Sequence, residues 1–378
     1  MEMQSTPPSF VERFFKVREK GSTVRTELLA GMTTFIAMAY ILFVNPNILA
    51  DAGIPKEAAI ASTIWIAALA SLAMGIFANY PVALAPGMGL NAFFAYYVCG
   101  VLGLHWTVAL GAVFFSGVLF LILTVGGIRQ AIINAVPRDL KYAISVGIGL
   151  FIAFIGLKGT GLIVENSATY VSLGHVTAPT TLLSLFGLLL TAALMARNVH
   201  GSILIGIFVT TILAMILGMT PAPKGITDIV STSLPHMGET FGQLDLAGAW
   251  HYGLISIIFT FTVVELFDNM GTLIGLTTKA KMVRPDGHIE NIDKALTTDA
   301  VGTMVSAMFG TSTVTSYIES AAGIAAGGRT GLTAVAAGVL FLAALLFTPL
   351  IGLVPAFATA PALILVGALL MSEVGKID

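Results

Sequence analysis

Long apolar runs follow one another along the chain from about residue 28, separated by short polar segments. A helix that crosses a bilayer needs about 20 mostly apolar residues, because the hydrocarbon core is roughly 30 Å thick and each residue rises about 1.5 Å. The polar residues 1–27 predict a retained N-terminal segment and not a cleavable signal, since no apolar run follows a short basic region at once. The runs of sufficient length predict full-length crossings at residues 28–46, 58–79, 101–125, 141–158, 180–196, 201–219, 250–275, 292–309, 331–349 and 353–371.

Two further apolar stretches are too short or too rich in glycine for ordinary crossings. They are PVALAPGMGLNAFFAYYVC at 81–99 and TSTVTSYIESAAGIAAGG at 311–328. Each opens with a few residues of extended character and continues as a half-helix of small residues. Extended backbone is tolerated at membrane depth only where it is buried in protein or lines a polar cavity. Paired broken segments in corresponding places of two halves point to the substrate site of a transporter, so we predict two discontinuous crossings.

The basic residues support this count of twelve crossings. With the N-terminus inside, all of the 18 lysines and arginines except Lys56, Lys158 and Lys224 fall in inside segments, as the positive-inside rule expects. The broken crossings are the third and the tenth, an offset of seven that indicates an inverted repeat. We therefore expect an all-α polytopic membrane protein with a 7+7 inverted repeat, of which this chain lacks the last two helices.

The composition of the chain argues against several classes of function. The chain is 56% hydrophobic and 10% charged, against roughly 25% charged residues in soluble domains. Its net charge of −2, without a basic block beyond the first 25 residues, argues against nucleic-acid binding. The single cysteine, Cys99, excludes an internal disulfide. No GxxxxGK[ST] or HExxH motif occurs, so neither ATP drive, a metal nor another cofactor is expected.

Carboxylates inside an apolar run provide the first candidate chemistry. Glu265 and Asp268 stand three residues apart in FTVVELFDNMGTLIG. On a helix they share a face with Asn269 and Thr272, so the four predict one polar stripe that faces a cavity and not lipid. Two carboxylates this close repel each other at low dielectric, and the pair is expected to take up a proton readily. The structural alternative is that Asp268 and Asn269 only satisfy backbone groups at a helix break.

The two broken crossings carry the other candidates. Glu319 follows TSTVTS at the start of the second half-helix, where unpaired N–H groups and the helix dipole stabilise a carboxylate or an anionic ligand group. Asn91, in GMGLNAFF, lies one turn inside the first half-helix. Its amide is expected either to fix the acid stripe or to contact substrate. A dipole partner without a ligand is the alternative for Glu319.

Four motifs together carry a family resemblance: GSTVRTELLAGMTTFIAMAYILFVNP, APGMGLNAFFAY, VELFDNMGTLIG and GTSTVTSYIESAAGIAAGGRTGLTAV. They resemble the AzgA-like adenine/guanine/hypoxanthine permeases of the nucleobase–cation symporter 2 (nucleobase–ascorbate transporter) superfamily, from about Gly21 to the last residue. The resemblance implies fourteen crossings, divided into a core domain (1–4 and 8–11) and a gate domain (5–7 and 12–14). Here the core would be residues 28–125 and 250–349, and the gate 126–249 and 350–378. Because crossings 13 and 14 are absent, two questions stay open: whether the gate domain is complete, and whether the protein forms a homodimer.

The same resemblance implies that a purine nucleobase binds between the third and tenth crossings. Its carried-over ligands are carboxylates of the eighth and tenth crossings, an asparagine of the third, and two residues whose backbone approaches the base: Glu265, Asp268, Glu319, Asn91, Tyr317 and Ile318. Ionised carboxylates accept the N–H groups of a purine, and protonated ones donate to its acceptors. Phe93, Phe94 and Tyr317 are candidates for stacking on the ring.

The expected function is therefore uptake of hypoxanthine, guanine or adenine across a cytoplasmic membrane by proton symport, with the N-terminus cytoplasmic. Glu319 would anchor the base, and Glu265 with Asp268 would couple protonation to binding. One alternative is an anion or sulfate transporter of related architecture, which three acids in the site disfavour. The other is an intramembrane aspartyl-type enzyme, disfavoured because both acids share one helix. The sequence leaves open the preferred base, sodium or proton coupling, and the oligomeric state.

Overall fold

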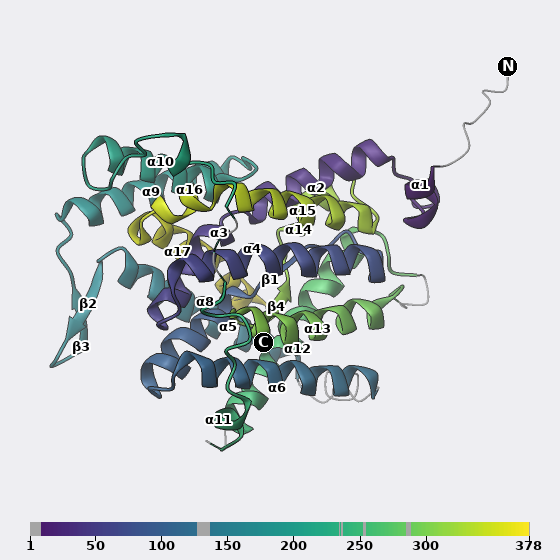
Figure 1. Ribbon diagram of the computed structural model, residues 1–378, viewed down its shortest axis with the longest axis horizontal. Coiled ribbons are helices and arrows are strands. Elements are labelled where there is room, and N and C mark those ends of the chain that lie inside the picture. Colours follow the sequence, from purple (N-terminus) through teal and green to yellow (C-terminus); the bar gives the residue numbers. More distant parts are fainter. Residues whose placement is uncertain are drawn as a thin grey trace.

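The computed structural model describes residues 9–126, 137–233, 235, 237–251, 255–284 and 289–377. Within them the chain forms a bundle of helices with two small antiparallel sheets, and the β1–β4 pair lies in the middle of the bundle (Figure 1). The β2–β3 hairpin projects from the bundle, and nothing in the sequence pattern predicted it.

The elements of the first half run from the N-terminus to the fourth helix after the first broken crossing. In order they are α1 (Phe10–Phe14), α2 (Val24–Met38), α3 (Ile41–Asp51), α4 (Lys56–Ala73) with a π-helical extension (Met74–Ala78), β1 (Leu84–Pro86), α5 (Met88–Ala92) with a π-helical extension (Phe93–Val101), α6 (Trp106–Val125), α8 (Arg138–Gly159), β2 (Ile163–Asn166), β3 (Tyr170–Leu173), α9 (Pro179–Ala196) and α10 (Ser202–Ile216).

The second half repeats a broken crossing among long helices. In order its elements are a 3-10 turn (Ile226–Asp228), α11 (Leu246–His251), α12 (Ile255–Lys279), α13 (Ile292–Phe309), β4 (Val314–Ser316), α14 (Ser320–Ala325), α15 (Gly331–Ala343) with a 3-10 extension (Ala344–Phe347), α16 (Thr348–Leu353), α17 (Ala356–Met371) and a 3-10 turn (Ser372–Lys376).

The predicted set of membrane crossings is recovered in the described part of the chain. Seven helical segments there are long and apolar enough to cross a membrane, and three shorter apolar helices accompany them. With α13 and the half-helix α14, they correspond one for one to the twelve predicted crossings. The prediction of a mostly helical multi-pass membrane protein with two broken crossings is confirmed.

The first crossing differs from the uninterrupted helix expected at 28–46. Helix α2 begins earlier, where the Thr23 hydroxyl accepts the N–H of Thr26 at 3.2 Å. It ends at Met38, and α3 continues the crossing with Pro46 inside it. Because proline lacks an N–H and disturbs the preceding helical turn, a crossing that contains one is prone to bend. Tyr40 lies at this break.

The predicted N-terminal segment 1–27 also extends too far. Glu27 is fully buried in the bundle. Its carboxylate accepts the backbone N–H groups of Arg329 at 2.9 Å and Thr330 at 3.2 Å, and the Thr333 hydroxyl at 2.6 Å. These donors belong to the start of α15, where unpaired N–H groups and the positive end of the helix dipole favour a carboxylate. Glu27 is therefore part of the membrane bundle.

Removal of this capping carboxylate is expected to destabilise the protein. Glu27→Ala leaves three donors without a charged acceptor, which should lower the free energy of unfolding by about 3 kcal/mol. The measurement is thermal unfolding of the purified protein in detergent. The exposed Glu19 provides the control, since Glu19→Ala should change the unfolding temperature little. An unchanged unfolding temperature for Glu27→Ala would contradict the capping role.

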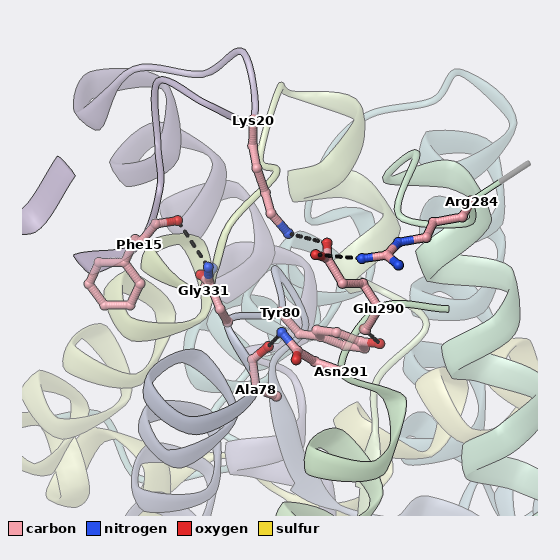
Figure 2. Close-up of polar contacts among 9 residues, drawn as sticks. Phe15, Lys20, Ala78, Tyr80, Arg284, Glu290, Asn291 and Gly331 are labelled. Atoms are coloured by element: carbon pink, nitrogen blue, oxygen red, sulfur yellow. Dashed lines mark hydrogen bonds and ion pairs between the residues drawn. The ribbon is translucent and has the colours of Figure 1, made fainter. Parts of the chain in front are cut away.

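At the same end of the bundle, polar contacts hold the N-terminal segment in place (Figure 2). The Asn79 side chain, on a left-handed residue (φ 56°), donates to the Phe15 carbonyl at 3.0 Å. Lys20 and Arg284 approach the Glu290 carboxylate at 3.5 and 3.6 Å, from the N-terminal segment and from the loop after α12 (Figure 2). These contacts join two segments that are far apart in the sequence.

The long helices pack in two groups. In the first group, helix α17 packs on α8 and α9. In the second, α13 packs on α6, and α15 packs on α2 and α4. Glycines allow the closest approaches: a Cβ on Gly149 would lie 2.6 Å from the Gly367 carbonyl oxygen, and one on Gly31 would lie 2.6 Å from the Thr333 carbonyl oxygen. Such small residues are the usual means of close helix packing in membranes. The predicted core–gate boundary at residue 126 adjoins residues 127–136, which lie outside the described residues.

Candidate functional site

The two broken crossings meet in the centre of the bundle. Strands β1 and β4 pair antiparallel, with Ala85 opposite Thr315. The pair is extended by the Gly87 N–H donating to the Thr313 carbonyl at 2.8 Å and the Tyr317 N–H donating to the Ala83 carbonyl at 3.1 Å. Each strand thus provides hydrogen-bond partners for backbone groups of the other. Non-helical backbone is tolerated at membrane depth only when it is buried in protein in this way or lines a polar cavity. The half-helices α5 and α14 start directly after the strands.

Gly87 permits this close approach of the two crossings. A Cβ at this position would lie 2.9 Å from Cγ2 of Thr315. We expect Gly87→Val to separate the strands and to lower the free energy of unfolding by about 1–3 kcal/mol, the usual cost of overpacking. Thermal unfolding in detergent measures it. Gly271→Ala is the matched control, because a Cβ there meets open space, and a Gly87→Val variant as stable as that control would refute the constraint.

A cavity of about 110 Å³ opens beside the paired strands. This is smaller than the roughly 300–1,000 Å³ of drug-sized binding sites, so it suits a small ligand. Walls come from the break in the first crossing, α5, α8, α12, the residues 315–319 and α17. Among the described residues that line it, none is basic. Its polar lining consists of Tyr40, Ser145, Asp268, Thr272, Thr315, Ser316, Tyr317 and Glu319.

Glu319 occupies the predicted position at the start of the second half-helix. It is the N-cap residue of α14, and its side chain makes no capping hydrogen bond. Its Oε1 instead accepts the Tyr40 hydroxyl at 2.7 Å. Tyr40 is a site residue that the sequence pattern did not single out. Its only local signal is its place in a crossing that contains Pro46.

The structure divides the predicted acid stripe of α12 between two environments. Asp268 and Thr272 line the cavity, and the Asp268 carboxylate accepts the Thr315 hydroxyl at 3.0 Å. Glu265 is fully buried and is not among the residues that line the cavity; its Oε1 accepts the Thr303 hydroxyl of α13 at 2.5 Å. One helix face is thus shared by a cavity-facing acid and an acid that faces a neighbouring helix.

Asn269 of the same stripe holds the second broken crossing. It is fully buried, and its Oδ1 accepts the Ser316 N–H at 2.7 Å and the Thr315 hydroxyl at 3.1 Å. Asn269 therefore satisfies backbone of β4 and not of a break in its own helix, because α12 continues without interruption from Ile255 to Lys279.

A further buried acid, Asp299, lies on α13 and was missed in the sequence. It is fully buried, interacts electrostatically with Glu265 and Asp268, and faces the Asn269 amide. Neither of its carboxylate oxygens makes a hydrogen bond of normal length within the described residues. The available signal was an acid inside the predicted crossing 292–309, four residues before Thr303 and so on the same helix face.

Asn91 has a different environment from the one expected at the site. Its Nδ2 donates to Oδ1 of Asn45, and the Asn45 amide donates to the hydroxyls of Thr63 at 2.7 Å and Thr311 at 3.3 Å. Asn91 is fully buried and is not among the residues that line the cavity. Through Asn45, this pair of asparagines links the first, second, third and tenth crossings.

Of the remaining candidates, some line the cavity and others do not. Tyr317 lines the cavity with its hydroxyl donating to the Pro86 carbonyl at 2.6 Å, and Ile318 lines it as an exposed side chain. Phe93 packs edge-on against Phe261, with ring centroids 5.1 Å apart, and Phe94 is fully buried. Neither phenylalanine is among the residues that line the cavity, whereas Tyr317 is.

Paired broken crossings around a polar cavity at the middle of a helical bundle define the class of secondary membrane transporters. The transmembrane domain of a cyanobacterial bicarbonate transporter, BicA, has a similar fold: the TM-score is 0.70 over 92% of this chain and 88% of that one, at 16% identity. At this identity the likeness shows the fold alone, and that fold is the inverted-repeat transporter fold.

The family is shown by closer relatives. A model of the permease family matches residues 25–378. The adenine permease AdeP of Escherichia coli is 45% identical over 375 residues, which are 99% of this chain and 83% of that protein. The guanine/hypoxanthine permease PbuO of Bacillus subtilis is 41% identical over 377 residues, 96% and 85% of the two chains. This chain belongs to that permease family, the nucleobase–ascorbate transporters, and the resemblance drawn from its motifs is confirmed.

Proposed function

We propose that the protein imports purine nucleobases (hypoxanthine, guanine or adenine) by proton symport across the cytoplasmic membrane. The observation that carries the proposal is the small cavity at the meeting of the two broken crossings, with Glu319 and Asp268 on its wall and no basic residue among its described lining. The names of the relatives AdeP and PbuO support purines as the substrate class. The acidic lining disfavours the anion transporter that the similar fold of BicA would otherwise suggest.

The cavity offers a purine complementary groups on several sides. Glu319 and Asp268 accept ring or exocyclic N–H groups when ionised. The Tyr317 ring provides an aromatic face, and the backbone at Ile318 approaches from the half-helix start. Tyr40 holds one Glu319 oxygen at 2.7 Å and leaves the other for the base. Glu319 is therefore the proposed anchor.

Proton coupling is assigned to the acids behind the cavity. Glu265 and Asp299 are fully buried between α12 and α13, and both interact with Asp268 on the cavity wall. Buried carboxylates repel one another, and a shared proton relieves that repulsion. A base that binds Asp268 changes the charge that the other two experience, which links binding to proton uptake.

Alternating access would come from motion of two groups of crossings. Residues 28–125 and 250–349 form the proposed core, and 126–249 and 350–378 form the proposed gate. The packing of α17 on α8 and α9, separate from that of α13 on α6 and of α15 on α2 and α4, supports this division. The basic residues of the N-terminal segment support a cytoplasmic N-terminus.

The test is uptake of radiolabelled hypoxanthine, guanine and adenine by cells that lack their own purine permeases and express this chain. The uptake rate should rise as the external pH falls, and a protonophore should abolish uptake. Replacement of sodium by choline should leave the uptake rate unchanged. Uptake that follows sodium and ignores the protonophore would overturn proton coupling while retaining the substrate. Absence of purine uptake with intact, membrane-inserted protein would overturn the proposed substrate class.

A further inference from the structure

The segment before the first crossing has one buried and one exposed side. Phe15 and Val17 are buried and pack with Leu332 at the start of α15. The two phenylalanines of the preceding helix α1 face outward, with Phe10 74% and Phe14 49% exposed, and their rings stack with centroids 6.1 Å apart. Helix α1 lies beyond the end of α2, outside the bundle of long helices (Figure 1). The bundle thus holds Phe15 and Val17, while the aromatic pair on α1 stays exposed among the described residues.

Positive charge accompanies this aromatic pair. Arg13, Lys16 and Arg25 are exposed, and within the part of the chain that the structure describes none of the three takes part in an ion pair. Arg18 of the same segment is instead paired with Glu12 at 2.9 Å. Exposed phenylalanines together with basic side chains are typical of segments that lie in the interface of a membrane with anionic lipids. Apolar and electrostatic attraction are therefore both available to the same surface.

Helix α2 indicates the depth of this surface. Leu28, Leu29 and Met32 are exposed on a helix that crosses the bilayer, so they face its hydrocarbon core. Arg25 stands three and four residues before the two leucines and therefore on the same helix face. At about 1.5 Å per residue, its backbone lies about 6 Å from that of Leu29 along the axis, and its long side chain can reach the headgroups from there. The lipid-facing stripe of α2 thus ends in a cation at headgroup depth.

We propose that the surface formed by Phe10, Arg13, Phe14, Lys16 and Arg25 binds the anionic headgroups of the adjoining leaflet, which is the cytoplasmic leaflet in the orientation proposed above. The two phenylalanine rings insert at the boundary between headgroups and acyl chains, and the three cations contact lipid phosphates. Because the surface is covalently continuous with a membrane crossing, the lipid is present beside it at high effective concentration. Positive charge without protein partners matches an anionic lipid and gives no preference for a neutral one.

The experiment measures the depth of nitroxide labels on single-cysteine variants of the full chain in vesicles. Cys99 is the only cysteine in the sequence, so Cys99→Ser provides a background into which Phe10→Cys or Phe14→Cys is introduced. The vesicles contain equal amounts of phosphatidylglycerol and phosphatidylcholine. Electron paramagnetic resonance compares the accessibility of each label to oxygen and to a water-soluble nickel chelate. Because oxygen concentrates in lipid and the chelate in water, labels at both positions should be reached better by oxygen.

Two exposed positions provide matched controls in the same background. A label on Met32→Cys, in the lipid-facing stripe of α2, should be reached better by oxygen. A label on Glu19→Cys, at the site of an exposed acid that anionic lipid would repel, should be reached better by the chelate. The proposal is overturned if the labels at positions 10 and 14 behave like the label at 19. It is also overturned if they are shielded from both reagents, because a protein surface such as a second copy would then cover them.

The preference for anionic lipid is tested by removing charge. Arg13→Gln combined with Lys16→Gln should lower the ratio of membrane-bound to water-exposed label at position 14 about 25-fold, at about fivefold for each cation near an anionic surface. Lys279→Gln combined with Lys281→Gln removes two exposed cations at the end of α12 and should leave that ratio unchanged. Vesicles of phosphatidylcholine alone should lower it for the unsubstituted chain. An unchanged ratio in phosphatidylcholine, or after the first pair of substitutions, would overturn the proposal. None of these measurements depends on purine uptake, so they stay decisive if the proposed function fails.

Discussion

Glu319→Gln is expected to abolish purine uptake, with a residual rate below about 1% of wild type, because a buried charged acceptor contributes about 1.5–3 kcal/mol and its loss leaves partners unpaired. Glutamine keeps the size of the side chain but replaces one acceptor oxygen by a donor. The new N–H₂ group then competes for the place of a purine N–H. The measurement is initial uptake of labelled hypoxanthine, guanine and adenine in cells without their own purine permeases.

Two further variants calibrate this result. Tyr40→Phe removes the hydroxyl that holds Oε1 of Glu319 at 2.7 Å but leaves the carboxylate, so uptake should fall only about tenfold, as for one neutral donor. Glu165→Gln, at an exposed position of β2, should not change uptake. A Glu319→Gln variant that reaches the membrane in normal amount and transports like wild type would refute the anchor.

Asp268→Asn and Glu265→Gln are expected to impair different steps of transport. Asp268 lines the cavity, whereas Glu265 faces Thr303 behind it. Asp268→Asn should therefore weaken purine binding by about 10- to 100-fold, the loss of one charge-assisted hydrogen bond. Glu265→Gln should bind purines nearly as well as wild type but should no longer accumulate them against a gradient, because the proton carrier is removed.

Binding and accumulation are measured on the same variants. Purine-dependent thermal stabilisation of the purified protein reports binding, and proteoliposomes with an imposed pH gradient report accumulation. Asp299→Asn should behave like Glu265→Gln, since both acids lie between α12 and α13. If Glu265→Gln abolished binding while Asp268→Asn preserved it, the roles of the two acids would be reversed.

The sequence predicted the crossings well because their signal is local. Length, hydropathy and the position of basic residues determine whether a segment can span a bilayer, and each is read within one segment. The two broken crossings were recognisable for the same reason: VALAP and TSTVTS combine extended residues with the start of a small-residue helix. Helix ends were less well predicted, since α2 begins at Val24 through a Thr23 cap and not at the first apolar residue.

The candidate acids were also recognisable locally, because a carboxylate inside an apolar crossing is costly and rarely accidental. Glu319 and Asp268 line the cavity as the pattern indicated. The helical face shared by Glu265 and Asp268 was correctly inferred from spacing, but a face 60° wide can meet two different neighbours at once. Only the position of α13 assigns Glu265 to Thr303 and Asp268 to the cavity.

What the sequence by itself could establish was the membrane-spanning architecture, the two interruptions and the identity of three acids inside the apolar segments. The tertiary structure added the partners of those acids: Tyr40 for Glu319, 279 positions away, and the buried Asp299 beside Glu265. It also placed Asn91 against Asn45 and away from the cavity. Each of these pairings joins residues of different crossings, and its geometry depends on the packing of the whole bundle. Hydrophobic patterning records which face of a helix is buried, but it does not record which neighbour that face meets.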